Sequence, residues 1–371
     1  MSLWTPEVVE VNADLERSIL ALPNRPAVFL IHARQGQPYP GRTALLRRRL
    51  LRLLGRRAQP SRLLNLREVA SRVEYQITAS RLEASLVFYE VARSHFPETY
   101  RDLMKLRMPS YLKVILSNAF PRCQVTTRLG GSRGLWYGPF RSRLGAEQFE
   151  SQFLDLFQVR RCTEDLAPAP DHPGCIYGEM NMCLRPCQQV VGPEEYASEV
   201  GRLARFLSTD GRSLSDAVTR ARDQASEGMD FEEAARLHRQ LEKVQAVVKL
   251  RDELVCDIDR LCGVAVTPSV ARGAVELWFV IGGGWLPPVR FNVEATGDRT
   301  VSLDRRLRDI ASPLCAPKLA SGQRQEHLAL LARWYYSTFR DGDWLSFNSP
   351  EELPYRKLVR AVSRQAQPTE S

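Results

Sequence analysis

Four cysteines within one short, proline-rich stretch constrain the fold of this chain more than any other feature. The stretch holds the cysteines Cys162, Cys175, Cys183 and Cys187. It also holds the prolines Pro168, Pro170, Pro173 and Pro186, so we expect most of it to be loop. A loop of this composition buries little apolar surface. Four thiolates that converge on a metal centre would supply the missing order.

The spacing of these cysteines, C-x12-C-x7-C-x3-C, leaves the metal open. Four thiolates can hold a tetrahedral zinc ion or a four-iron, four-sulfur cluster, and the tight C-x2-C pairs of structural zinc sites are absent. Unligated buried thiols are a third interpretation. His172 could substitute as a ligand, although a solvated loop histidine is the simpler interpretation. The remaining cysteines are scattered, at Cys123, Cys256, Cys262 and Cys315.

The composition indicates a cytoplasmic protein of several domains. None of the apolar runs in its 371 residues approaches the roughly 18 residues of a membrane span. The N-terminus carries Glu7 and Glu10 and lacks the pattern of a secretory signal. We therefore expect no membrane contact, and cysteines that are reduced thiols or metal ligands. A chain of this length, 44% hydrophobic, is long for one core and predicts two to four domains.

Positive charge is concentrated near the N-terminus. The net charge is +9, and no Asp or Glu lies between Glu16 and Glu68. The arginines gathered in that segment include Arg42, Arg47, Arg48, Arg49, Arg52, Arg56, Arg57 and Arg62. A segment of one sign is an electrostatic footprint for phosphate. The competing interpretation is a general preference for arginine, because only six of the 52 basic residues are lysine.

The hydrophobic pattern predicts an α+β protein. Short apolar runs predict strands near 27–31, 73–78, 111–116, 124–129, 264–266 and 275–281. Apolar residues at helical spacing predict helices near 43–57, 83–96, 145–157, 194–207 and 325–340. A helical hairpin is expected from 214 to 254, with a break at Gly228 and an apolar seam of Ala217, Ala221, Phe231, Ala235, Leu241, Val244 and Val248. The run Gly130–Gly134 is expected to be a flexible turn.

Several segments, in their order and spacing, resemble the UvrC family of excinuclease subunits. Ala27-Val28-Phe29 and Tyr39-Pro40-Gly41 resemble the two motifs of its N-terminal GIY-YIG-type nuclease domain, and residues 41–50 resemble the helix that follows them. Phe120-Pro121-Arg122, Tyr137-Gly138-Pro139-Phe140 and the run from Phe157 to Cys162 are similar to later family segments. Residues 229–241 resemble the UVR motif. The resemblance covers about residues 25–254.

The resemblance implies a phosphodiester-cleaving centre that uses Mg or Mn, and this chain departs from it. Tyr39 matches the second-motif tyrosine, Arg49 matches the helix arginine, and Arg42 replaces a lysine. Phe29 stands where the first tyrosine would be, so the hydroxyl is lost. Phe88 stands where the metal-binding glutamate is expected, and phenylalanine cannot ligate a metal. The chain therefore predicts a degenerate centre that keeps a phosphate-binding surface.

The same resemblance implies a cofactor and a partner. It associates Cys162, Cys175, Cys183 and Cys187 with an iron–sulfur (4Fe-4S) cluster, with zinc as the alternative. It also implies that the hairpin pairs with the equivalent hairpin of a UvrB-like protein, through Phe231, Ala235 and Leu241. An ordinary intramolecular helical pair is the competing interpretation, and His238 is expected at the rim of the seam. DNA would contact the basic residues Arg42, Arg47, Arg48, Arg52 and Arg56.

The resemblance ends in a C-terminal third without clear catalytic residues. Asp257-Ile258-Asp259 and residues 275–286 resemble the first strands of the family's RNase H-like nuclease. Asp298, Asp304 and Asp309 are more typical of surface charges than of an acidic catalytic group. We expect a small α/β domain with a packing or partner-binding role.

Together these observations divide the chain into five parts. We expect an N-terminal extension (1–24), a degenerate GIY-YIG-like α/β/α domain (25–105), a Cys-cluster region (106–209), the UVR hairpin (210–254) and the C-terminal α/β domain (255–371). The leading hypothesis is a DNA-repair protein that binds DNA and a UvrB-like partner with an impaired nuclease. The alternatives are an active endonuclease that makes one metal-dependent incision, and a regulator that occupies UvrB without contacting lesions.

Overall fold

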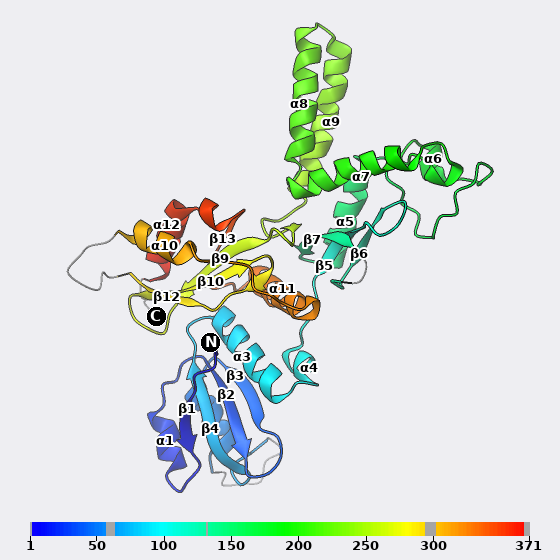
Figure 1. Cartoon of the computed structure of the whole chain (residues 1–371). Coiled ribbons are helices and arrows are strands. Elements are labelled where there is room, and N and C mark those ends of the chain that lie inside the picture. The colour runs from blue at the N-terminus through cyan, green and yellow to red at the C-terminus, as the bar shows by residue number, and fades with distance from the viewer. Residues whose placement is uncertain (1, 57–63, 131–132, 294–301, 367–371) are drawn as a thin grey trace.

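The computed structural model describes residues 2–56, 64–130, 133–293 and 302–366. Arg57, Arg62 and Asp298, which the sequence singled out, lie outside the described residues. Figure 1 shows three sheets, each covered by helices, and a helical hairpin that projects away from them. The topology is mixed α+β with antiparallel sheets, as predicted.

The N-terminal sheet has helices on both faces because one of its inner strands is apolar and buried over residues 27–31. Its strands, in the order β1-β4-β2-β3, are β1 (Glu7–Glu10), β4 (Ala70–Ile77), β2 (Ala27–Ala33) and β3 (Tyr39–Thr43). Its helices are α1 (Leu15–Ala21), α2 (Leu46–Leu54), α3 (Arg81–His95) and α4 (Tyr100–Met104). Successive residues of a strand point to opposite faces. Phe29 therefore packs in the cluster that holds α1 and α2, and Val28 in the cluster that holds α3.

The middle region is built on a second antiparallel sheet. Its strands, in the order β6-β5-β7-β8, are β6 (Arg122–Thr126), β5 (Ser110–Ile115), β7 (Gly134–Phe140) and β8 (Cys256–Asp257). Its helices are α5 (Arg143–Leu154), α6 (Ile176–Glu179) and α7 (Pro193–Ser208), with a 3-10 turn at Pro186–Gln188. Stacked and tilted phenylalanines from α5 and α7, among them Phe149, Phe153 and Phe206, fill the core.

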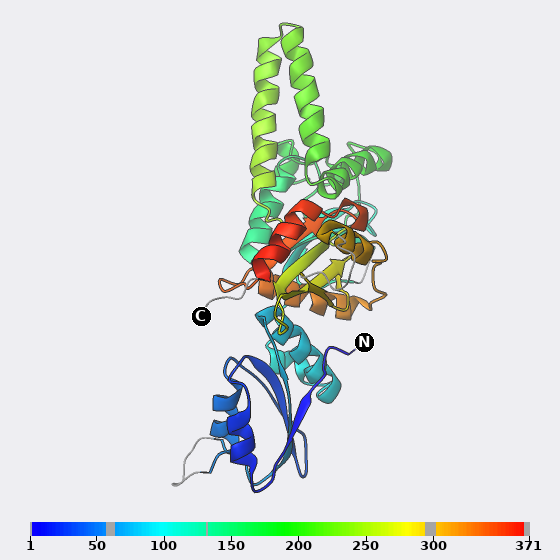
Figure 2. The same ribbon diagram turned by 90° about the vertical axis from the view of Figure 1, so that its left-hand side faces the viewer.

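The hairpin consists of α8 (Arg212–Glu227) and α9 (Phe231–Lys249). Asp230 caps α9 by accepting the backbone N–H of Glu233 at 3.0 Å. The two helices run side by side and project from the middle region in both views (Figures 1 and 2).

The C-terminal part forms a third antiparallel sheet. Its strands are β9 (Cys262–Pro268), β10 (Ala274–Ile281), β11 (Gly284–Trp285), β12 (Val289–Asn292) and β13 (Asp343–Phe347). Its helices are α10 (Leu303–Ala311), α11 (Ser321–Tyr335) and α12 (Tyr355–Gln365), with a 3-10 turn at Pro350–Glu352. One face of β9 and β10 packs in the cluster of α10 and α12, and the other face packs with α11.

Two sequence expectations need correction here. Asp257 does not begin the C-terminal sheet: it pairs with Tyr137 in β7, so β8 completes the middle sheet. In the predicted turn from Gly130 to Gly134, residues 131–132 lie outside the described residues, and Gly134 already belongs to β7. The sequence analysis also did not predict β1, α1, α10, α12, β12 and β13. Helices α10 and α12 do have apolar residues at helical spacing, with Leu307 and Ala311 buried in one and Leu358 and Val362 in the other, so this signal was missed.

One hydrophobic cluster links the N-terminal and C-terminal sheets. It runs from Leu30 in β2 through Leu86 in α3 to Leu331 in α11 and Trp278 in β10. Figure 1 shows α3 between the N-terminal sheet and α11. The two parts therefore share a core at α3. None of the helices in the described part of the chain is long and apolar enough to cross a membrane.

Candidate nucleic-acid interface and four-cysteine region

Helix α2 separates an apolar face from a basic one. Leu46, Leu50, Leu53 and Leu54 are buried against the N-terminal sheet. Arg48 and Arg52 lie one turn apart on this helix and are exposed, and Arg56, just beyond the helix end, is exposed as well. Arg47 differs, because its Nε donates to the carbonyl of Leu22 at 3.0 Å and its side chain ties α2 to the end of α1. Of the predicted DNA contacts on and just after the helix, Arg48, Arg52 and Arg56 are therefore the accessible ones.

A cavity of about 550 Å³ lies beside the start of α2. Its lining consists of Arg42, Thr43, Ala44, Leu45, Arg48, Arg49 and Arg52. This lining contains no carboxylate and four guanidinium groups, so the cavity attracts anions. Arginine forks match the geometry of phosphate oxygens.

The structure brings together three of the predicted nuclease positions. Arg49 Nη2 donates to the hydroxyl of Tyr39 at 3.1 Å. The Phe29 and Tyr39 rings lie 6.4 Å apart, and the Phe29 ring sits against Gly41 so closely that no side chain would fit there. Phe29 is fully buried. Its ring therefore has a packing role, and no polar group replaces the missing hydroxyl.

Arg42 and Phe88 form a second contact, on the α3 side of the sheet. The guanidinium of Arg42 lies 5.1 Å from the Phe88 ring centre and donates to Ser85 Oγ at 3.1 Å. Arg42 as a residue is exposed, but protein atoms surround its charged end. That desolvation, with the charge of Arg333, lowers the pKa of Arg42. Phe88 is buried in the core that α3 shares with α11.

The donor set beside Tyr39 and Arg49 does not fit a catalytic Mg or Mn ion. Such an ion takes hard oxygen ligands, carboxylates above all. The cavity offers the hydroxyl of Thr43, which already bonds with the backbone of Leu45. Asp341, which lines the adjoining cavity, accepts hydrogen bonds from the backbone of Arg81 and from Trp334 Nε1. The expected ligand position holds the ring of Phe88.

The four cysteines lie together in the loops between α5 and α7. Cys162 follows α5, Cys175 precedes α6, Cys183 lies before the 3-10 turn, and Cys187 lies within it. Buried Arg160 organises the loop, donating to Cys162 Sγ at 3.5 Å and to the carbonyls of Phe120 and Glu164. Burial, with charge from the other three thiols, raises the pKa of Cys183 to about 11. At neutral pH Cys183 therefore stays a protonated thiol in the absence of a bound cation.

The four thiols, as the structure places them, do not form a site for a single metal ion. Around one zinc ion, sulfurs would lie about 3.8 Å apart, given Zn–S bonds of about 2.3 Å. In the described part of the chain, no three Cys, His, Asp or Glu side chains are arranged to hold a metal ion. His172 is engaged locally, because its Nδ1 accepts the backbone N–H of Gly174 at 3.0 Å. The iron–sulfur cluster and its zinc alternative both stay predictions.

The hairpin seam agrees in part with the predicted one, because Leu241 and Val244 are buried and Ala221 and Val248 pack against the same cluster. The buried residues are Leu214, Val218, Leu237, Leu241, Val244 and Val247. The bulkier side chains fill the seam because they bury more apolar surface than alanine. Ala217 and Ala235 are therefore exposed, and Phe231 at the tip is 71% exposed. Of the predicted partner contacts, Leu241 is buried within the chain, and Phe231 and Ala235 remain accessible. His238 is exposed beside Glu242.

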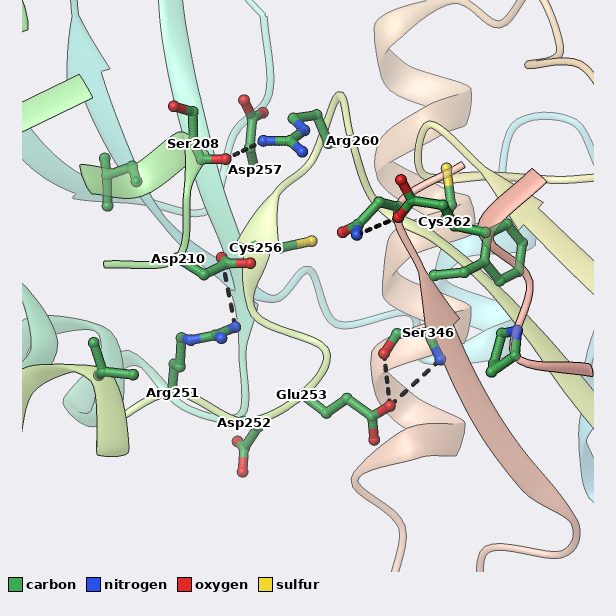
Figure 3. A pocket seen from close by; sticks show the side chains of 16 residues that line it. Ser208, Asp210, Arg251, Asp252, Glu253, Cys256, Asp257, Arg260, Cys262 and Ser346 are labelled. Atoms are coloured by element: carbon green, nitrogen blue, oxygen red, sulfur yellow. Dashed lines mark hydrogen bonds and ion pairs between the residues drawn. The ribbon is translucent and has the colours of Figure 1, made fainter. Parts of the chain in front are cut away.

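A further cavity of about 540 Å³ lies where the hairpin meets the C-terminal part (Figure 3). Arg251 points toward Asp210, 3.5 Å away, and Arg260 donates to the carbonyl of Ser208. Glu253 accepts from the hydroxyl of Ser346 at 2.6 Å. Five carboxylates and two arginines line the cavity, so its charge does not suit phosphate. These contacts join α7, α9 and β13.

The middle of the chain matches a known protein family. Residues 110–206 match the family model of the UvrC/Cho excinuclease middle domain. This match spans β5 to α7 and includes all four cysteines. The chain thus contains a middle domain of excinuclease type.

The similarity extends to both sides of this domain. UvrABC system protein C of Lachnospira eligens is 25% identical over 77% of this chain and 47% of its own length. The protein of the same name from Moorella thermoacetica is 28% identical over 63% and 38%. That of Dehalococcoides mccartyi is 26% identical over 96% and 59%. The chain is a UvrC-like protein, and it spans about half the length of these relatives. No solved structure matches the chain significantly.

Sequence reasoning missed the neighbours of Arg42. Ser85 and Arg333 carry no local motif, and Arg333 is far away in the chain. Only the packing of α3 against α11 brings Arg333 near. A prediction of that contact would have required knowing which helices share a core.

Proposed function

We propose that this chain is a DNA-binding, UvrC-like protein of the nucleotide-excision-repair type that does not cleave DNA. The observation that carries the proposal is the cavity at α2. Four arginines line it without a carboxylate, and Phe88 replaces the expected metal ligand. Such a surface neutralises phosphates and has no means to activate water with a metal. Phosphate contacts position a protein on DNA without reading its sequence.

The other parts of the molecule have supporting roles in this proposal. The four cysteines hold a 4Fe-4S cluster that orders the loop between α5 and α7. The exposed tip of the hairpin, with Met229, Phe231 and Ala235, pairs with the hairpin of a UvrB-like partner. An apolar tip of this kind is typical of a surface that a partner covers. The protein acts in the cytoplasm, where DNA repair takes place in bacteria.

DNA binding is tested by the salt dependence of affinity. Replacing Arg48 and Arg52 with Gln should weaken binding to all duplex sequences about equally. It should also reduce the slope of log affinity against log salt by about two units, one per lost phosphate contact. The matched control replaces Arg356 and Arg360 in α12, an exposed pair with the same four-residue spacing. If the two double variants show the same slope of log affinity against log salt, the basic face of α2 does not bind DNA.

The alternative function is a single metal-dependent incision, and the preserved contact between Tyr39 and Arg49 favours it. We expect nicking of damaged duplex with Mg or Mn to stay at background, measured by conversion of supercoiled plasmid. Phe88→Glu, compared with Phe88→Gln, should be the only variant of the pair to gain activity, because only it adds a carboxylate beside Arg42. Robust nicking by the unmodified protein that Arg49→Ala abolishes would establish the endonuclease.

A further inference from the structure

A second cavity adjoins the α2 cavity and lies between the N-terminal and C-terminal parts. It measures about 640 Å³ and shares Arg42, Thr43 and Ala44 with its neighbour. Its opposite wall comes from α11 and the loop after it, including Leu330, Arg333 and Phe339. The start of α3, at Ser80 and Arg81, forms a third side. The basic lining of α2 therefore continues into the gap between two parts of the molecule.

The charges in this second cavity favour an anion. Arg42, Arg81 and Arg333 line it, and among the described residues no carboxylate forms an ion pair with any of them. Arg42 and Arg333 are close enough to repel each other. Asp341 is the one acidic residue in the lining, and its oxygens accept bonds from the Arg81 backbone and Trp334. Arg333 donates to the carbonyls of Met104 and Lys105, so Arg42 and Arg81 are the guanidinium groups left to bind a phosphate in this cavity.

An aromatic ring is presented to solvent beside these charges. Phe339 is 68% exposed, which is unusual for a phenylalanine in a basic cavity. Its backbone N–H donates to Ser337 Oγ at 3.2 Å. The guanidinium of Arg81 lies 5.0 Å from the ring centre. The next residue, Arg340, lies over the Tyr335 ring at 4.9 Å. Aromatic rings interleaved with arginines are how proteins hold unpaired nucleotides.

We propose that this cavity holds one unpaired nucleotide of DNA, with its phosphate between Arg42 and Arg81 and its base stacked on Phe339. The inference rests on the proposed DNA binding. It adds a preference for unpaired over paired nucleotides, which phosphate contacts alone cannot supply. A paired base is stacked inside the duplex and cannot reach the ring. The site therefore distinguishes locally opened DNA, such as a bubble or a distorted lesion site, from regular duplex.

The test compares two labelled DNA probes with the full chain at one salt concentration. One is a regular duplex, and the other has the same ends with a short central run of unpaired thymines. Phe339→Ala should weaken binding of the bubble by about 5- to 150-fold, the loss expected for one stacked base, and leave the duplex unchanged. Phe339→Trp should keep the preference. Leu144→Ala, which removes another exposed apolar side chain, is the control.

A second readout reports stacking directly. A 2-aminopurine placed in the unpaired run should be quenched on binding, and Phe339→Ala should abolish the quenching. Equal loss on both probes, or no loss on either, overturns the stacking site while leaving DNA binding intact. Arg48→Gln with Arg52→Gln should weaken both probes together. If the unmodified protein binds neither probe, DNA binding itself is refuted, and the nucleotide site with it.

Discussion

At the scale of single residues, two neighbouring buried side chains of α11, Glu326 and His327, make hydrogen bonds at the junction of the N-terminal and C-terminal parts. Glu326 accepts from the hydroxyls of Tyr89 and Tyr100, each at 2.6 Å, and from Arg101 at 2.8 Å. Burial opposes ionisation, but these hydrogen bonds lower the pKa of Glu326. Its neighbour His327 accepts the backbone N–H of Trp285 on Nδ1 at 3.0 Å, which requires an unprotonated nitrogen. Burial lowers the pKa of His327 to about 4.

His327 should therefore make stability depend on pH below neutrality. Its pKa is about 4 when folded, against an ordinary 6.5, so the unfolded chain binds the proton more readily between these values. The stabilisation is complete above pH 6.5 and falls as the pH drops toward 4, by about 3 kcal/mol. His327→Asn keeps an acceptor without the titration. The difference in thermal midpoint between the unmodified protein and His327→Asn should shrink as the pH falls from 6.5 to 4. A difference that stays constant over this range would contradict the role of His327.

At the scale of elements, the four-cysteine loop and the hairpin were predicted to different depths. The sequence identified both segments and the helix boundaries near Gly228, because cysteine spacing and apolar periodicity are local signals. It predicted part of the seam, at Leu241 and Val244, but also assigned Ala217, Phe231 and Ala235 to it, and these are exposed. Alanine and leucine both count as apolar in a pattern, whereas packing selects Val218 and Leu237 for their volume.

The cysteine loop leads to a prediction about iron. Protein purified without oxygen should be brown and contain about four irons per chain, as ligation by four thiolates in a cubane requires. Cys183→Ser should bleach the absorbance and increase proteolysis between α5 and α7. Cys123→Ser, a buried thiol outside the loop, is the control and should keep the iron. Stoichiometric zinc in a colourless anaerobic preparation would decide for the alternative metal.

At the scale of the whole molecule, α3 belongs to two parts at once. It covers the N-terminal sheet and also packs against α11, so the segments 25–105 and 255–371 share a core. The sequence divided the chain at changes in composition, and a shared core leaves no such mark. The contact also creates the cavity that Arg42 and Phe339 both line.

Removing the carboxylate of Glu326 should loosen this junction. Glu326→Leu leaves the hydroxyls of Tyr89 and Tyr100 without an acceptor, at about 1–3 kcal/mol for each buried group. Hydrogen exchange should then increase in both α3 and α11. Arg101→Gln should have a much smaller effect, because that side chain is 56% exposed. An increase confined to α11 would show that the network does not couple the two parts.

The sequence by itself determined the α+β class, the main helices and strands, the basic face of α2, the cysteine stretch and the UvrC-like character. Each of these depends on periodicity, charge or spacing between residues that are near each other in the chain. The tertiary structure decided which arginines remain accessible, which hairpin residues are buried, and that β8 joins the middle sheet. It also decided that Arg42 and Arg333 line one cavity. These outcomes depend on side-chain volume and on contacts between distant segments, which no local pattern encodes.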